Sequence, residues 1–82
     1  MINIKVLLFS ILKEKVGRES IQINMPPAVT GKQLLDRLSE EFEPIGVYRK
    51  VIRIAVNESY VTESHDLVDG DEVALITPVS GG

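Results

Sequence analysis

The stretch "TGKQLLDRLSEEF", Thr30–Phe42, carries the clearest periodicity in the chain. Thr30 followed three residues later by Gln33 is a capping box, in which each side chain satisfies a backbone N–H at the start of a helix. The apolar residues that follow have helical spacing and leave the charged residues on the opposite face; they are Leu34, Leu35, Leu38 and Phe42. Pro44 and Gly46 are predicted to end this helix. An amphipathic helix of this kind must bury its apolar face against another element of the fold.

Strands are predicted on both sides of the helix. Alternation of the kind found in half-buried strands is seen over Ile2–Phe9, Ser20–Asn24, Val51–Asn57, Ser59–Thr62 and Glu72–Ile76. The segment after the first strand, Ser10–Gly17, favours a short helix or a wide turn, and Asp69-Gly70 a turn before the last strand. This order predicts an α+β fold, a mixed sheet with one main helix packed on one face. The first and last long strands are expected at the centre of the sheet.

A single domain accounts for the length of 82 residues. Because 44% of the residues are hydrophobic and none is cysteine, a core rather than disulfides is expected to hold the domain together. Alternation assigns the following strand residues to that core: Ile2, Ile4, Val6, Leu8, Ile52, Ile54, Val56, Val73 and Leu75. We expect residues 1–76 to form the domain and residues 77–82 a flexible C-terminal tail that ends in Gly-Gly.

The face of the sheet away from the helix is only partly polar. If the first and last strands are neighbours, apolar residues form a patch on this open face, at the end from which the tail leaves; they are Leu7, Phe9, Ala74 and Ile76. An exposed apolar patch usually binds another protein. The alternative is that a loop around Val47-Tyr48 folds back and covers the patch.

Charge and hydropathy argue against two classes of partner. Nine basic and twelve acidic residues give a net charge of −3, whereas binding to nucleic acid relies on clustered Lys and Arg. The near-continuous apolar run Ile2–Leu12 is interrupted by polar residues and does not predict a membrane span. The start "MINIKV" lacks the pattern of a signal peptide, so the cytoplasm is the expected compartment.

The side chains offer little chemistry of their own. The single histidine, His65, lies in a polar loop beside Ser64 and Asp66, and neighbours in sequence do not make a catalytic triad. The segment "DGDE", Asp69–Glu72, lacks the EF-hand pattern and is expected to be a turn rather than a metal site. One reactive group remains, the carboxylate of Gly82, which is ionised at neutral pH and inert until something activates it.

The tail "TPVSGG" suits such a terminal group. Six extended residues reach roughly 20 Å, well beyond the radius of gyration of about 12 Å that is typical of a domain this size. Gly81 and Gly82 have no side chains to obstruct a narrow channel. Pro78 stiffens the root of the tail and keeps it from pairing as a strand. The tail is therefore predicted to enter a pocket in another protein.

Several segments together resemble the small, sulfur-carrying subunit of molybdopterin synthase. Beside the amphipathic helix they are "LLFSILKEKVG" at Leu7–Gly17, "AVNESYV" at Ala55–Val61 and "LVDGDEVALITPVSGG" at Leu67–Gly82. The similarity runs the length of the chain, and its most specific part is the terminal Pro-Val-Ser-Gly-Gly. In one departure, Thr77 stands where members often carry the first of two prolines. The resemblance implies the ubiquitin-like β-grasp fold.

The resemblance also implies a sulfur carrier of molybdenum cofactor biosynthesis, which is not an enzyme by itself and binds no cofactor. An adenylating enzyme would use ATP to activate the carboxylate of Gly82, and a sulfur donor protein would convert it to a thiocarboxylate. The tail would then enter the active site of the large synthase subunit and deliver sulfur to the pterin precursor. Threading would involve the other tail residues, Pro78, Val79, Ser80 and Gly81.

A partner interface follows from the same resemblance. Phe9 and Ile76 match positions at which the family places apolar contacts to the large subunit, and both belong to the patch predicted from alternation. Leu7 and Ala74 complete that patch, and Tyr60 is a weaker candidate for the same surface.

Three alternatives stay open at this stage. The first is a sulfur carrier of the same fold that serves thiamine or another pathway, although the "FSILKEKVG" segment favours the molybdopterin branch. The second is a ubiquitin-like modifier, whose Gly82 would form an isopeptide bond with lysines of target proteins. The third is a β-grasp adaptor whose tail is incidental.

Overall fold

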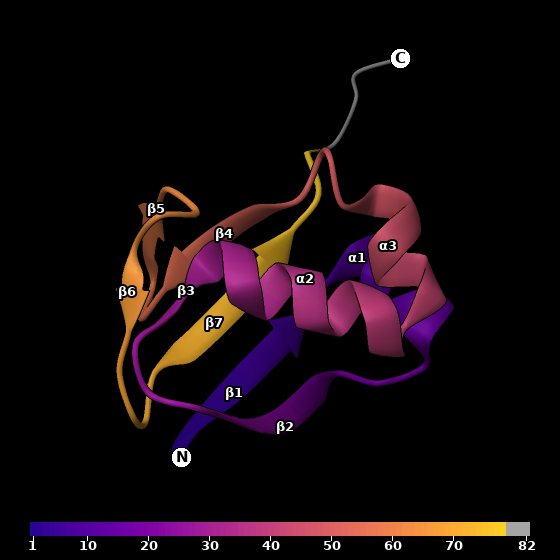
Figure 1. Cartoon of the computed structure of the whole chain (residues 1–82). Coiled ribbons are helices and arrows are strands. Elements are labelled where there is room, and N and C mark those ends of the chain that lie inside the picture. Colours follow the sequence, from indigo (N-terminus) through magenta and orange to yellow (C-terminus); the bar gives the residue numbers. More distant parts are fainter. Residues whose placement is uncertain (79–82) are drawn as a thin grey trace.

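A computed structural model describes residues 1–78 of the chain. Their main feature is a five-stranded sheet with the strand order β2-β1-β7-β4-β5 (Figure 1). The strands are β1 (Ile2–Leu8), β2 (Ser20–Met25), β4 (Arg53–Val56), β5 (Ser59–Val61) and β7 (Glu72–Ile76). The pair β1–β7 is parallel and the other three pairs are antiparallel. The prediction that the first and last long strands lie centrally is confirmed.

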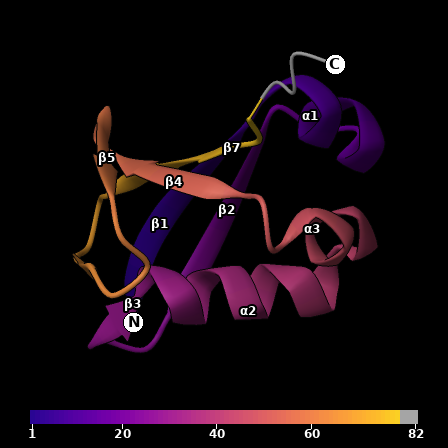
Figure 2. The same cartoon turned by 90° about the horizontal axis from the view of Figure 1, so that it is seen from above.

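Helix α2 (Gly31–Glu41) covers one face of this sheet (Figure 2). The predicted capping box is present: the Gln33 backbone N–H donates to Thr30 Oγ1, and the Thr30 backbone N–H donates to Gln33 Oε1 at 2.8 Å. Leu34, Leu35 and Leu38 are fully buried. The amphipathic pattern of the sequence is thus satisfied by burial against the sheet.

The first turn of α2 is also hydrogen-bonded to the segment that follows β5. The backbone N–H of Gly31 donates to the carbonyl of His65 at 3.0 Å, and that of Lys32 donates to the carbonyl of Glu63 at 2.8 Å. Next to these contacts, β3 (Val29–Thr30) pairs with β6 (Asp66–Leu67) in a second, two-residue ladder. Sequence periodicity did not predict β3 or β6.

Two short helices gather at the end of the sheet where β7 finishes (Figure 2). One is α1 (Ser10–Val16), which was expected, and it ends at Gly17 in the left-handed conformation with φ of 80°. The other is α3 (Glu43–Tyr48), which packs against α2 and α1. The main helix ends at Glu41, before Pro44, as predicted. The prediction omitted α3, which has Pro44 in its first turn and contains Gly46. Proline is tolerated there, since the first N–H groups of a helix have no intrahelical partner.

The core follows the predicted faces of the strands. All the predicted core residues are buried except Ile2 and Phe42, which are half-buried and pack against its edge. Other elements contribute further buried side chains that the prediction omitted: Leu12, Ile21, Ile23, Met25, Val29, Ile45 and Leu67. Within residues 1–78, no helix is long and apolar enough to cross a membrane.

Candidate functional site

The open face of the sheet carries a row of side chains that crosses four strands. Leu7 of β1 lies beside Ala74 of β7, and Ala74 lies opposite Ala55 of β4. Ala55 in turn lies opposite Tyr60 of β5. Leu7 and Ala74 are half-buried and the Tyr60 side chain is 67% exposed. Ala55 is buried.

Phe9 and Ile76 extend this row toward the end of the sheet where the tail begins. Ile76 is the last residue of β7 and is half-buried, and Phe9 directly follows β1 and is 46% exposed. We call Leu7, Phe9, Tyr60, Ala74 and Ile76 the apolar patch. It contains every residue that the sequence assigned to the partner interface.

Local backbone geometry fixes Phe9 at the start of α1. The chain turns from strand to helix through Ser10, which has a φ of 49°. The Phe9 carbonyl accepts hydrogen bonds from the N–H groups of Leu12 at 3.1 Å and Lys13 at 3.3 Å. Phe9 is therefore held at the boundary of two regular elements, not on a free loop.

The alternative that a loop around Val47-Tyr48 covers the patch is wrong. Both residues belong to α3, which packs against α2 and α1. Tyr48 is half-buried against the core, and Val47 is 71% exposed. The apolar patch stays accessible among residues 1–78.

The predicted tail begins next to the patch. Thr77 is half-buried and Pro78 is exposed, directly after β7. The remaining predicted tail residues lie outside the described residues: Val79, Ser80, Gly81 and Gly82. The predicted reactive group, the carboxylate of Gly82, is among these.

The two aspartates of "DGDE" accept hydrogen bonds that hold the turn in place. Asp71, 5% exposed, accepts hydrogen bonds from the Val68 backbone N–H at 2.8 Å and from Asn57 Nδ2 at 3.0 Å. Asp69 Oδ1 accepts the backbone N–H of Asn3 at 2.7 Å. Gly70 between them has a φ of 88°, which a side chain would disfavour. The predicted turn is confirmed.

His65 has no catalytic arrangement with its sequence neighbours. Its backbone N–H donates to the Thr62 carbonyl at 3.1 Å, and its side chain is exposed. The Ser64 hydroxyl pairs with Thr62 Oγ1 at 2.9 Å. Among residues 1–78, no group of three or more His, Cys, Asp or Glu side chains is placed to hold a metal ion.

Arg49 is the centre of an ion cluster at the helix side of the sheet. Its guanidinium donates to both Glu63 carboxylate oxygens at 2.9 Å and to Asp36 Oδ1 at 3.3 Å. Hydrogen bonding from Arg49 lowers the pKa of Glu63, and Glu63 in turn raises the pKa of Arg49. The pKa of Asp36 is lowered chiefly by Lys32, whose Nζ lies 3.0 Å from Oδ2.

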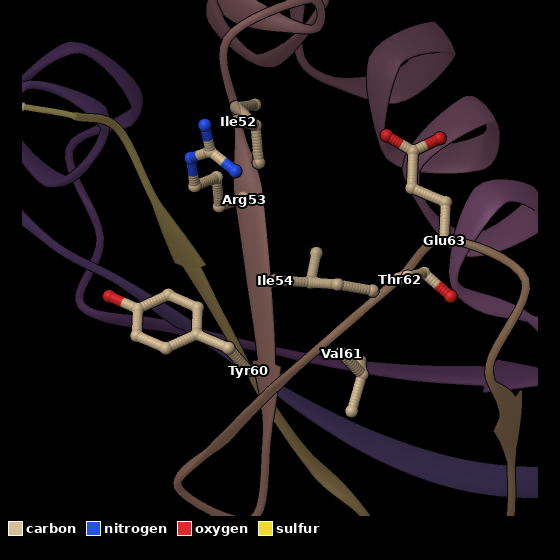
Figure 3. Close-up of a pocket in the computed structure, with 7 residues that line it drawn as sticks. All are labelled: Ile52, Arg53, Ile54, Tyr60, Val61, Thr62 and Glu63. Atoms are coloured by element: carbon tan, nitrogen blue, oxygen red, sulfur yellow. The ribbon is translucent and has the colours of Figure 1, made fainter.

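A hollow of about 460 Å³ opens at the β4–β5 edge of the sheet (Figure 3). Its lining residues are Ile52, Arg53, Ile54, Tyr60, Val61, Thr62 and Glu63. The hollow shares Tyr60 with the apolar patch, and Arg53 lies directly opposite Ile76. The sequence pattern did not predict the hollow.

A protein-family model matches this chain over residues 6–82, which include the patch, the hollow and the Gly-Gly end. The chain belongs to the ThiS family.

Curated relatives of this ThiS-family chain include the molybdopterin synthase sulfur carrier subunit of Arabidopsis thaliana. The two are 37% identical over 81 residues, which cover 99% of this chain and 84% of the relative. The resemblance recognised in the sequence is confirmed.

Solved structures of similar chains agree with the fold. One is SAMP1, small archaeal modifier protein 1, from Haloferax volcanii, with a TM-score of 0.82, 26% identity, and 98% of this chain and 99% of that chain covered. Another is a protein–protein complex of subunits 1 and 2 of the molybdopterin-converting factor from Helicobacter pylori, with a TM-score of 0.71, 27% identity, and 99% and 100% covered. The chain has the ubiquitin-like β-grasp fold.

Proposed function

We propose that this chain is the sulfur carrier of molybdopterin synthase and donates sulfur from a thiocarboxylate on Gly82. The observation that carries the proposal is the identity of 37% to a molybdopterin synthase sulfur carrier subunit across 99% of this chain. The match of the family model through residue 82, the Gly-Gly end, supports it.

The chemistry needs activation from outside the chain. In the proposed sequence, the carboxylate of Gly82 attacks ATP on an adenylating enzyme, forming an acyl-adenylate and releasing pyrophosphate. A sulfur donor protein then supplies sulfur at the oxidation level of sulfide. This sulfur attacks the acyl carbon, the bond from that carbon to AMP breaks, and the terminus becomes a thiocarboxylate. This chain is a substrate in both steps and is not an enzyme by itself.

Sulfur transfer then takes place on a second partner, the large synthase subunit. The apolar patch lies beside the root of the tail, so one docking event would hold the domain and direct Pro78–Gly82 into the partner's active site. A related chain occurs in a complex of two molybdopterin-converting factor subunits, which supports a large-subunit partner. The compartment stays a prediction, the cytoplasm.

The decisive experiment follows Gly82 by intact mass. The purified chain is incubated with ATP, its activating enzyme and a sulfur source, and then with a thiol-reactive alkylator. Because the chain has no cysteine, alkylator uptake mapped to Gly82 identifies the thiocarboxylate. The alkylation step is required because oxidation of Met1, which is 80% exposed, adds nearly the same mass as exchange of oxygen for sulfur.

Deletion of Gly82 is the matched control. The truncated chain is expected to melt at the wild-type temperature, since the predicted core ends with β7, and to lose sulfur transfer completely. Unchanged sulfur transfer by the truncated chain would refute the proposal and would favour the adaptor alternative.

A second candidate is supported by the similarity to SAMP1, at 26% identity and a TM-score of 0.82. As a protein modifier, the chain would form isopeptide bonds from Gly82 to lysines of other proteins. Covalent conjugates in cell extract that disappear when Gly82 is deleted would favour it. A carrier for thiamine or another pathway would instead form the thiocarboxylate and fail to support molybdopterin synthesis with the large subunit.

A further inference from the structure

Arg53 lies on the open face of the sheet. It lies opposite Ile76 in the β4–β7 pair, next to the end of the sheet where the tail begins. Figure 3 shows Arg53 and Tyr60 pointing to the same side of β4, while Ile54 and Glu63 point to the other. The guanidinium is therefore beside the apolar patch and not in the core.

The charge of Arg53 is not neutralised by the residues the structure describes. Among residues 1–78, Arg53 makes neither a salt bridge within 4.0 Å nor a side-chain hydrogen bond, whereas Arg37 pairs with Glu41 and Arg49 with Glu63 and Asp36. Among the residues that line the hollow, Glu63 is the single carboxylate. Both of its oxygens are already held by Arg49 at 2.9 Å.

The hollow beside Arg53 exists because β5 is shorter than the strand it accompanies. The ladder between β4 and β5 ends at the pair Ile54–Val61. Beyond it the chain turns away to α2, where the Glu63 carbonyl accepts the Lys32 N–H at 2.8 Å. Arg53, the first residue of β4, is therefore left without a β5 partner, and the hollow beside it has room for a side chain from outside.

We propose that this hollow receives a carboxylate side chain of the large synthase subunit, bound by the guanidinium of Arg53. A guanidinium presents parallel N–H donors that match a carboxylate, and the Tyr60 hydroxyl at the rim is a further donor. The contact is continuous with the apolar patch, so both would be covered by the same partner. The inference rests on the proposed function. It adds that Arg53 selects the partner by charge, as charged groups at the rim of an interface do.

The test is equilibrium binding of the full-length chain to its own large synthase subunit at low and high salt. Arg53→Gln is expected to weaken binding about tenfold at low salt, as for loss of a charged hydrogen bond. Its affinity should also depend less on salt than that of the wild type. Arg53→Lys keeps the positive charge but lacks the parallel N–H donors of the guanidinium, and it should therefore restore part of the affinity.

Arg37→Gln is the matched control, because it removes the same charge from α2 on the opposite side of the sheet. It is expected to bind within about twofold of the wild type, as surface charges far from an interface do. If Arg53→Gln and Arg37→Gln bind alike, the inference is refuted and the proposed function is unaffected. If the wild type itself does not bind the large subunit, the proposed function is refuted together with the inference.

Discussion

At Gly31 the first turn of α2 lies directly against the sheet. A Cβ on this residue would collide with Cδ1 of Ile54 and would come within 3.3 Å of the Glu63 carbonyl oxygen. Gly31→Ala is therefore expected to destabilise the protein by about 1–3 kcal/mol, as overpacking in a core does. Denaturant unfolding of the variant measures this loss.

Ile54→Val tests the cause of that loss, because it removes the colliding Cδ1. Alone it should cost about 0.5–1.5 kcal/mol. Combined with Gly31→Ala, it should cost less than the sum of the two single losses. Strict additivity would place the strain at the Glu63 carbonyl.

Phe9 carries the second prediction at the residue scale. Phe9→Asp should weaken binding to the large subunit by tenfold or more, because large aromatic side chains dominate interfaces of this kind. Its melting temperature should change little, since the side chain is 46% exposed. Val47→Asp, at a residue 71% exposed on α3, is the control for placing a charge on an apolar surface. Normal binding with a large loss of stability would show that Phe9 is a core residue.

At the scale of elements, α2 depends on its capping box. Thr30→Ala removes the Thr30 Oγ1 acceptor for the Gln33 N–H and is expected to cost about 1 kcal/mol. For a domain of this size, that loss lowers the melting temperature by about 4–8 °C. Because Gln33→Ala breaks the other half of the same box, the double variant should lose less than the two single variants together. Calorimetry of the three variants checks both statements.

Helix α2 could be predicted from the sequence because its signals are local. Its cap and apolar stripe lie within one short stretch, and the packing reinforces what they favour. Helix α3 could not, because Pro44 has two opposite meanings, a stop for α2 and a favourable first turn for the next helix. Only the burial of Ile45 against the core decides between them.

The candidate site also has one part that the sequence predicts and one part that it does not. Alternation along β1 and β7, with the assumption that the two are neighbours, predicted the apolar patch. The hollow at Arg53 depends instead on where the chain goes after Val61, and that path is set by the backbone contact between Lys32 and Glu63. A contact between residues so far apart in the sequence leaves no periodic signal.

At the scale of the whole molecule, the Arg49 cluster joins three parts of the chain: α2 through Asp36, the end of α3, and the segment after β5 through Glu63. The folded pKa of Glu63 lies below its ordinary value of 4.5. The folded state thus binds fewer protons than the unfolded state, and the stabilisation is present above about pH 4.5 and is lost as the pH falls through the folded pKa.

Glu63→Gln and Arg49→Met should therefore both flatten the fall in unfolding free energy below about pH 4.5. The amplitude removed should be at most about 1 kcal/mol, because the pair is partly exposed and screened by solvent. Urea unfolding from neutral to acid pH measures it. If the unfolding free energy of both variants falls as steeply at acid pH as that of the wild type, the ion pair does not contribute to the pH dependence of stability.

The parallel pairing of β1 with β7 also determines when the domain can fold. Lys5 of β1 lies beside Glu72 of β7, so the middle of the sheet joins two segments at nearly opposite ends of the sequence. Contacts across so much intervening chain require closure of a long loop and slow folding. During synthesis the central pair cannot form until β7 has left the ribosome. Because Ala74 and Ile76 belong to β7, the surface proposed to bind the partner is assembled in the same late step. A chain whose synthesis stops before β7 would lack this surface and would not compete for the partner.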